Sequence, residues 1–527
     1  MLFCVEQTLA LLRIAEIPRF FTAVDLLSAT GTIERCIELR SRESGVSLFP
    51  DHFPRRRAEN CFRIFWVGDS ALDPRPYGEV SSSPRRLEAR LRAMFGVDRV
   101  EVIACVAPLH HSAQIADLCG ELAQDGADLL IVSLGHDEFL EDEGSFGSKV
   151  FATIRGCRTG RWLLGAVSAG SRPVKALGGA GPEPEGFTDQ APRRFDDLSR
   201  LRRSLQRIVA GAALRGCPVM FCLPVGDLLD QEPFLSVFDA STSGRQRAQI
   251  VQDLATSRLL KSEGHPSEAL AVLDSLALLS PSTALIAYER ARILEELGEH
   301  QKALELFVLA RDLDQRPARA GSTILDHIRS FARDCGAILA DPEPLLFTKA
   351  RGGVFCSERF LDHVHLDCRG QSLVVSAVLK AMADHGLIER THRWNFARDL
   401  DFEDESRALS IDPIELHRAL AEQCLNDLPH LIRHHLEPDR WLGSVLETAL
   451  KDDPAHVPSL VATGIHRWLQ GDDDQSMPFL CKALEVDEES ARRILLELCE
   501  SCPGLSERLE YLGIRLSCDS TASSEGW

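Results

Sequence analysis

No apolar run in this sequence is long enough to cross a membrane, which takes about 20 consecutive apolar residues. The first twenty residues, MLFCVEQTLALLRIAEIPRF, are interrupted by Glu6, Arg13 and Glu16. That is too much charge for a signal-peptide core or a membrane span. We therefore expect a soluble, cytoplasmic protein with no membrane segment in this chain.

Basic residues are in short supply. The 59 Lys and Arg residues face 79 Asp and Glu residues, which gives a formal net charge of −20. Nucleic-acid binding depends on clustered Lys and Arg that neutralise phosphates. The balance therefore argues against a nucleic-acid partner and otherwise indicates only a well-solvated surface.

The sixteen cysteines do not form a recognisable disulfide framework. They are scattered, and several lie in apolar stretches, as Cys105, Cys217 and Cys222 do. Buried free thiols in a reducing compartment explain this distribution better than disulfides do. Cys499 and Cys502 have the spacing of a thiol pair, but no second pair or histidine cluster completes a zinc site. We interpret them as incidental cysteines at a helix end.

The stretch RIFWVGDS, residues 63–70, predicts a buried strand that runs into a tight turn. Gly68 lets the chain bend without a Cβ clash, so Ser70 can project from the carboxyl end of the strand. A serine becomes a nucleophile only when a base takes its proton and a third group orients that base. Asp362 and His365 in FLDHVHL are the candidates, and His363 in the same loop is a rival base.

Apolar runs alternate with helical patterns over much of the chain. Because each run is apolar throughout, we expect a parallel sheet covered by helices on both faces. Active residues of such sheets gather at the carboxyl ends of the strands, where Ser70, Val106 and Asp137 fall. The expected strands are residues 63–68, 100–106, 128–134, 218–227 and 336–341, and the expected helices are residues 83–94, 113–123, 198–214 and 373–384.

A 34-residue period appears twice. An interval of this length, with small residues where helices touch, is typical of tetratricopeptide (TPR) helix pairs. In the first block, Gly264, Ala269, Leu270 and Leu273 recur as Gly298, Ala303, Leu304 and Phe307. In the second block, Ala449, Leu450 and Asp453 recur as Ala483, Leu484 and Asp487. Since repeats need stacked neighbours to bury their faces, we expect the two blocks to touch each other or to be capped by the sheet domain.

Four motifs in this order resemble the SGNH (GDSL-like) hydrolase family, in the form that also carries TPR repeats. The family's nucleophile turn after the first strand is matched by Gly68, Asp69 and Ser70. Its D-x-x-H motif near the end of the domain is matched by Asp362 and His365. The resemblance implies a Ser-His-Asp triad in which His365 accepts the proton of Ser70 and Asp362 orients the imidazole.

The oxyanion hole of that family departs from its pattern here. The family's donors are the amide of the nucleophile, a glycine after the second strand, and an asparagine in a G-x-N turn after the third. Gly135-His136-Asp137-Glu138-Phe139 is similar to the G-H-N-E-F form of that turn, with Asp137 at the asparagine position, and Val106 stands at the glycine position.

The charge state of Asp137 separates two interpretations. An ionised carboxylate only accepts hydrogen bonds and would repel an oxyanion, whereas a protonated one can donate as asparagine does. Four acidic residues follow closely and favour the neutral form by like-charge repulsion. They are Glu138, Glu141, Asp142 and Glu143. A working esterase and a degenerate binding domain therefore both remain open.

Other residues near the expected site have structural alternatives. His110 and His111 follow the second strand near the expected substrate position, but solvated loop histidines explain them as well. Carboxylates of Asp69, Asp137 and Glu138 at adjacent strand ends would suit Mg²⁺, although we expect neither metal nor cofactor. Phe234, with Asp227 and Pro233, matches a stretch that relatives use after the fourth strand. The Phe234 side chain either borders the substrate pocket or has only a packing role.

We therefore expect an α/β fold: a flavodoxin-like SGNH hydrolase domain with a parallel sheet in three α/β/α layers, plus inserted and C-terminal all-α TPR-like repeats. The predicted function is a serine esterase with an ester or acylated substrate and a protein partner bound through the repeats. Relatives often carry a membrane anchor upstream of where this chain begins, and the sequence does not exclude such an anchor here. The expected parts are a helical and loop segment (1–60), the hydrolase domain (61–245 and 321–390), an inserted TPR pair (246–320), a helical domain (391–515) and a disordered tail (516–527).

Overall fold

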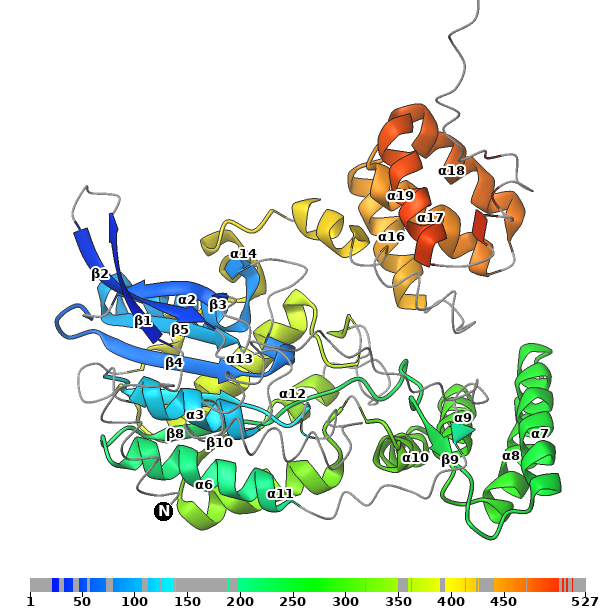
Figure 1. Ribbon diagram of the computed structural model, residues 1–527, viewed down its shortest axis with the longest axis horizontal. Coiled ribbons are helices and arrows are strands. Elements are labelled where there is room, and N and C mark those ends of the chain that lie inside the picture. Colours follow the sequence, from blue (N-terminus) through cyan, green and yellow to red (C-terminus); the bar gives the residue numbers. More distant parts are fainter. Residues whose placement is uncertain are drawn as a thin grey trace, which may run out of the picture. The chain divides into compact units, whose positions relative to one another are not determined.

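The protein forms two compact units in a computed structural model (Figure 1). One comprises residues 1–73 and 83–400, and the other comprises residues 74–82 and 401–527. The structure describes residues 21–27, 33–40, 47–54, 57–72, 79–106, 112–123, 126–136, 138, 187–188, 198–317, 319–348, 359–361, 363–388, 394–412, 414–422, 425, 440–470, 472–501, 505–506, 509 and 514.

A five-stranded parallel sheet lies at the centre of the first unit. The strands are β4 (Phe62–Gly68), β5 (Val100–Val106), β6 (Leu129–Ser133), β8 (Val219–Cys222) and β10 (Ile338–Ala340). They lie in the order β5-β4-β6-β8-β10, and each neighbouring pair is parallel. In chain order this is 2-1-3-4-5, the doubly wound order of flavodoxin-like sheets. The five predicted strands and the parallel sheet are confirmed.

Helices cover both faces of this sheet, as the apolar strands predicted. Along β4, Ile64 and Trp66 enter one core and Phe65 and Val67 enter the other, because successive side chains of a strand point to opposite faces. The covering helices are α2 (Ser83–Phe95) and α13 (Cys368–Asp384) on the first face, and α3 (Ser112–Leu122), α6 (Ser199–Ala213) and α11 (Ser322–Cys335) on the second.

Three antiparallel strands extend the sheet beyond β5. They are β1 (Phe21–Leu27), β2 (Ile33–Arg40) and β3 (Ser47–Pro54), and β3 joins the sheet where Phe49 pairs with Val106. The prediction of a helical and loop segment over residues 1–60 is therefore wrong in these ranges. The reason is visible in IERCIELR, where apolar Ile33, Ile37 and Leu39 fall on alternate positions, the period of a strand. The predicted helix near the start lies outside the described residues.

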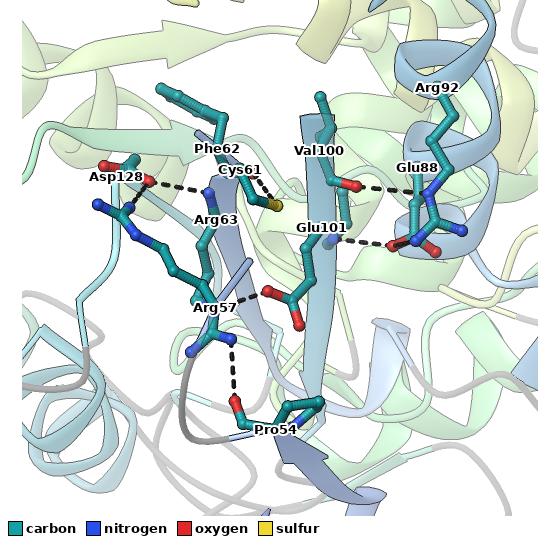
Figure 2. Close-up of polar contacts among 11 residues, drawn as sticks. Pro54, Arg57, Cys61, Phe62, Arg63, Glu88, Arg92, Val100, Glu101 and Asp128 are labelled. Atoms are coloured by element: carbon teal, nitrogen blue, oxygen red, sulfur yellow. Dashed lines mark hydrogen bonds and ion pairs between the residues drawn. The ribbon is translucent and has the colours of Figure 1, made fainter. Parts of the chain in front are cut away.

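A polar cluster holds the amino ends of β4 and β5 (Figure 2). Arg63 is buried, and its Nε donates to Glu101 at 2.7 Å while Nη2 donates to the carbonyl of Pro54 at 2.9 Å. The Asp128 carboxylate accepts from the Arg63 amide at 2.9 Å and from the exposed side chain of Arg57. These contacts lie at the end of the sheet opposite the carboxyl ends of the strands.

Four antiparallel helices stand between β8 and β10, where the first 34-residue period falls. They are α7 (Gly244–Ser262), α8 (Pro266–Leu279), α9 (Ala284–Glu296) and α10 (His300–Leu313). Gly264 and Gly298 both have positive φ, +84° and +79°, and each terminates the first helix of a pair. Ala269 and Ala303 are both fully buried. The repeat is therefore structural, and α9 and α10 contribute to the same core as the sheet.

The second unit is helical. Its described helices include α14 (Phe402–Ala408), α16 (Arg440–Asp452), α17 (Val457–Leu469), α18 (Asp473–Val486) and α19 (Glu488–Ser501). The last four contribute to one core. The second period is also confirmed, because the amide of Asp453 donates to Ala449 at 2.9 Å and that of Asp487 donates to Ala483 at 3.1 Å.

Three smaller expectations can be compared with the structure. Cys105, Cys217 and Cys222 are buried free thiols, as predicted, although Cys217 precedes β8. In the Gly/Pro-rich stretch at 165–192, Phe187–Thr188 forms β7, which pairs with β9 (Ser236–Val237). Its other residues and the tail lie outside the described part. Within that part, no helix has the length and apolar character of a membrane span.

Candidate active site

The turn after β4 begins where the central strand ends. Gly68 is the last strand residue, and Ser70 starts a short 3-10 turn that ends at Leu72. A Cβ on Gly68 would lie 3.0 Å from the Leu72 side chain and 3.2 Å from the carbonyl oxygen of Ser133. The predicted glycine is thus required by close approach of β6 and the turn. The side chain of Ser70 itself lies outside the described part.

This turn lies at the switch point of the sheet. β4 pairs with β5 on one side and with β6 on the other. The connection from β4 therefore leads to one side of it, and the next connection crosses to the other side. In open α/β sheets, ligands bind outside the carboxyl ends of the strands at this point. Gly68 is in register with Val106 on β5 and with Ser133 on β6, so all three ends meet at one edge.

Asp69 joins the loops that follow β4 and β6. It is buried, and its carboxylate accepts from the amide of Ala71 at 3.2 Å and from the amide of His136 at 3.3 Å. Its own amide donates to the carbonyl of Ser133 at 3.2 Å. Asp69 therefore orders the turn that carries Ser70 and connects it to the Gly135-His136 turn.

The position of the Gly135–Glu138 turn is fixed from both ends. Gly135 has a φ of +133°, a conformation that favours glycine. Glu138 is buried, and its carboxylate accepts from the amide and hydroxyl of Ser112 and from Nε of Arg200 at 3.1 Å. Asp137, which lies between these residues, is outside the described part. The Asp69 and Glu138 carboxylates thus have protein donors, and the described residues contain no group of three side chains arranged to hold a metal ion.

The loop with the D-x-x-H motif is short and closed by its own backbone. Phe360 and Leu366 form an antiparallel bridge, and the amide of Leu361 donates to the carbonyl of His365 at 2.7 Å. Asp367 then caps α13 by accepting from the amide of Gly370 at 2.5 Å. His363 and His365 are both half-buried in this loop, and Asp362 lies outside the described part.

A series of contacts connects the serine turn to this loop along the carboxyl edge of the sheet. The contacts join the loops that follow β4, β6 and β8, the segment between α10 and α11, and the D-x-x-H loop. From the serine turn onwards, the Asp69 carboxylate accepts from the His136 amide at 3.3 Å, His136 Nδ1 accepts from the Ala320 amide at 3.2 Å, Arg319 donates to the carbonyl of Asp227, and the Asp227 amide donates to the carbonyl of His363 at 2.9 Å. Both candidate loops therefore lie at this edge.

Phe234 and Asp227 contact the D-x-x-H loop. The ring of Phe234 stacks on the imidazole of His363, with centroids 4.3 Å apart and planes inclined by 19°. Burial raises the pKa of the Asp227 carboxyl to about 7, and the nearby Asp230 carboxylate adds to the rise, while Arg319 opposes it. His363 thus has a packing partner on the loop that follows β8.

Val106 occupies a strand position. It is buried at the end of β5 and is paired with Phe49 on one side and with Gly68 on the other. In a sheet, backbone amides point toward neighbouring strands. A backbone donor for an oxyanion at this point of the chain would therefore come from residues after Val106. Residues 107–111, which include His110 and His111, lie outside the described part.

Two contributors to this edge carry no motif that the sequence could reveal, and a third has a role that its motif does not predict. Arg319 and Ala320 follow the inserted helices and return to the sheet edge only through the fold. His136 forms part of the recognised turn, but its role as an acceptor for Ala320 depends on that return. Because Nδ1 accepts, the neutral ring carries its proton on Nε2.

No protein-family model matches this chain, and no curated protein matches it. Among solved structures, one that is similar to this chain is the crystal structure of YrrB, "a TPR protein with an unusual peptide-binding site". It shares 13% sequence identity, and the match covers 48% of this chain and 94% of that chain at a TM-score of 0.15. A TM-score this low supports no inference about function. From its own structure, the chain is an α/β protein with a parallel five-stranded sheet and helical repeats.

Proposed function

We propose that this protein is a serine esterase or acyl hydrolase of the SGNH type. Ser70 attacks the ester carbonyl, His365 takes its proton, and Asp362 holds the imidazole in the required tautomer. The observation that supports this most is the series of contacts from Asp69 to His363 along the carboxyl edge, because it connects the serine turn to the loop that carries the imidazole.

His365 is the preferred base because His363 has another role. The His363 ring stacks on Phe234, and its carbonyl accepts from the Asp227 amide. The stack fixes the His363 ring against the loop that follows β8, whereas the D-x-x-H motif of the family places the base at His365. His365 lies two residues further along the same loop.

The proposed oxyanion hole uses the amide of Ser70 and the carboxyl of Asp137 in its neutral form. A neutral carboxyl donates one hydrogen bond, as asparagine would in the family's turn. The turn is held by Gly135 and by the buried Glu138, which pairs with the partly exposed Arg200. No cofactor or metal takes part in the proposed reaction.

A binding domain without catalysis is the second candidate function. The strand position of Val106 and the carboxyl at residue 137 both favour it, since each removes a donor that the family uses. In that case the sheet edge would hold a ligand or peptide. In both proposals the helical repeats recruit a protein partner, because stacked helical repeats present extended binding surfaces.

The experiment is hydrolysis of a short-chain nitrophenyl ester. Ser70→Ala should lower kcat/KM by at least about 10⁴-fold, whereas Ser275→Ala, on the exposed side of α8, should leave it unchanged. His365→Gln should lose far more activity than His363→Gln. Hydrolysis that survives Ser70→Ala would exclude the proposed nucleophile.

Asp137→Asn separates the two candidate functions. If the hole is intact apart from this residue, the variant should gain activity by roughly 10²-fold. No activity in either the wild type or the Asn variant, with both folded, supports the binding domain.

A further inference from the structure

The loop between β8 and α7 contacts both the inserted repeats and the candidate active site. It begins at the sheet edge, where Asp227 and Phe234 contact the D-x-x-H loop. It then runs along the first helix of each repeat before it enters α7. Its position is therefore set by two separate parts of the fold.

On the repeat side, α9 binds the backbone of this loop. The hydroxyl of Tyr288 donates to the carbonyl of Leu229 at 2.8 Å, and Nη1 of Arg292 donates to the same carbonyl at 3.2 Å and to the Asp230 carboxylate at 2.8 Å. Tyr288 is 4% exposed, and burial raises its pKa well above the usual range. Tyr288 is thus a protonated donor to this carbonyl.

The helix α7 contributes a second contact. Nε of Arg258 donates to Glu289 on α9 at 2.5 Å, and its Nη2 donates to Glu232 in the loop at 3.1 Å. Tyr288, Glu289 and Arg258 lie on the side where α7 and α9 meet the loop. Along this stretch, the face formed by the two helices is therefore occupied by the chain's own loop.

On the site side, the same loop fits closely against the D-x-x-H loop. A Cβ on Gly226 would lie 3.0 Å from the carbonyl oxygen of His363, and the Asp227 amide donates to that oxygen at 2.9 Å. Leu229 is only two residues from Asp227. A shift of the Leu229 carbonyl is therefore transmitted to the backbone that holds His363.

We propose that Tyr288 and Arg292 are positioning residues for the base His365, acting through residues 227–234. This inference rests on the proposed esterase function. Both side chains hold the Leu229 carbonyl, the loop holds His363, and His363 lies two residues from His365. The inserted repeats therefore form part of the catalytic framework as well as a separate recruiting element.

Tyr288→Phe and Arg292→Gln test the proposal, with Arg290→Gln as the matched control. Arg290 lies on the same helix, but its partner is Asp274 on α8 and not the loop. Because a displacement of about 1 Å can cost up to 10²-fold in rate, both test variants should lower kcat by roughly 10-fold at nearly constant KM. Arg292→Lys, which retains a donor, should recover part of the rate. The control should behave as the wild type.

Hydrogen exchange of residues 359–367 provides a readout that does not depend on activity. The amides of Leu361 and Asp367 are hydrogen-bonded within this loop, and they should exchange faster in Tyr288→Phe and Arg292→Gln than in Arg290→Gln. Exchange rates and kcat that match the control in both test variants would overturn the positioning role. If the wild type has no esterase activity but exchange is still faster in the two test variants, then Tyr288 and Arg292 do hold the D-x-x-H loop, and it is the proposed esterase function that fails.

Discussion

Asp227 shows how a single buried carboxyl can make stability depend on pH. It is 2% exposed, and burial raises its pKa to about 7 from the usual 3.8. Because the folded-state pKa lies above the unfolded one, the folded protein binds this proton more tightly. The stabilisation from this group is therefore present in acid and is lost as the pH rises from about 4 to about 7.

Asp227→Asn removes this titration and keeps the acceptor for the amides of Leu229 and Asp230. Relative to the wild type, the variant should gain on the order of 1 kcal/mol of unfolding free energy for each pH unit between pH 4 and 7. Urea unfolding of both proteins near pH 5 and near pH 7 measures the difference. Asp274→Asn, an exposed carboxyl on α8, should show no such trend. A pH-independent difference for Asp227→Asn would show that its folded-state pKa is unshifted.

Among single residues, the sequence predicted those whose role follows from their immediate neighbours in the chain. Gly68 was expected to allow a tight turn, and the close approach of Leu72 and Ser133 confirms that need. Ala320 and His136 were not recognised as contacts. Their meeting depends on the chain returning from the inserted helices, which no local pattern encodes.

Among the elements, the central strands were predictable because each is a continuous apolar run bounded by turn residues. Their order was not, since an apolar run carries no information about its neighbours. β1, β2 and β3 were missed because they come before the recognised pattern, although apolar residues alternate along β2. Pairing of β3 with β5 through Phe49 and Val106 is a non-local contact.

The strand β4 depends on Arg63 at its amino end. The guanidinium has 1% side-chain exposure and pairs with Glu101, which has 21%. Arg63→Met should destabilise the protein by about 3 kcal/mol, because it leaves Glu101 and the Pro54 carbonyl without their donor. Chemical unfolding measures this cost.

Arg57→Gln is the matched control for that change. Arg57 pairs with Asp128 in the same cluster, but the two side chains are 43% and 30% exposed. Exposed ion pairs contribute about 0–1 kcal/mol, so this variant should unfold nearly as the wild type does. Equal costs for the two substitutions would show that burial does not set the strength of the Arg63 contact.

For the whole molecule, the two helical blocks differ in how they bury their apolar surfaces. The inserted helices α9 and α10 place Ala287, Tyr288 and Phe307 in the same core as the sheet. Among the residues that the structure describes, the core of the C-terminal helices is made of residues between 421 and 514. The first block has a small core of its own, which includes Ile250 and Leu273, and it is also capped by the sheet domain, one of the two arrangements expected from the sequence. The described core of the second block shares no residue with the sheet core.

This difference predicts which block folds in isolation. A fragment of residues 401–527 should be helical by circular dichroism and should unfold cooperatively on heating, because it retains all the described residues of this core. A fragment of residues 239–316 contains a complete repeat pair of similar helix length, but it exposes the side that α9 and α10 bury against the sheet. Two repeats without a cap bury too little surface to be stable, so this fragment should show low helicity and no cooperative transition. If the second fragment unfolds as cooperatively as the first, then the inserted pair does not depend on the sheet, and its contacts with residues 227–234 join two independently stable parts.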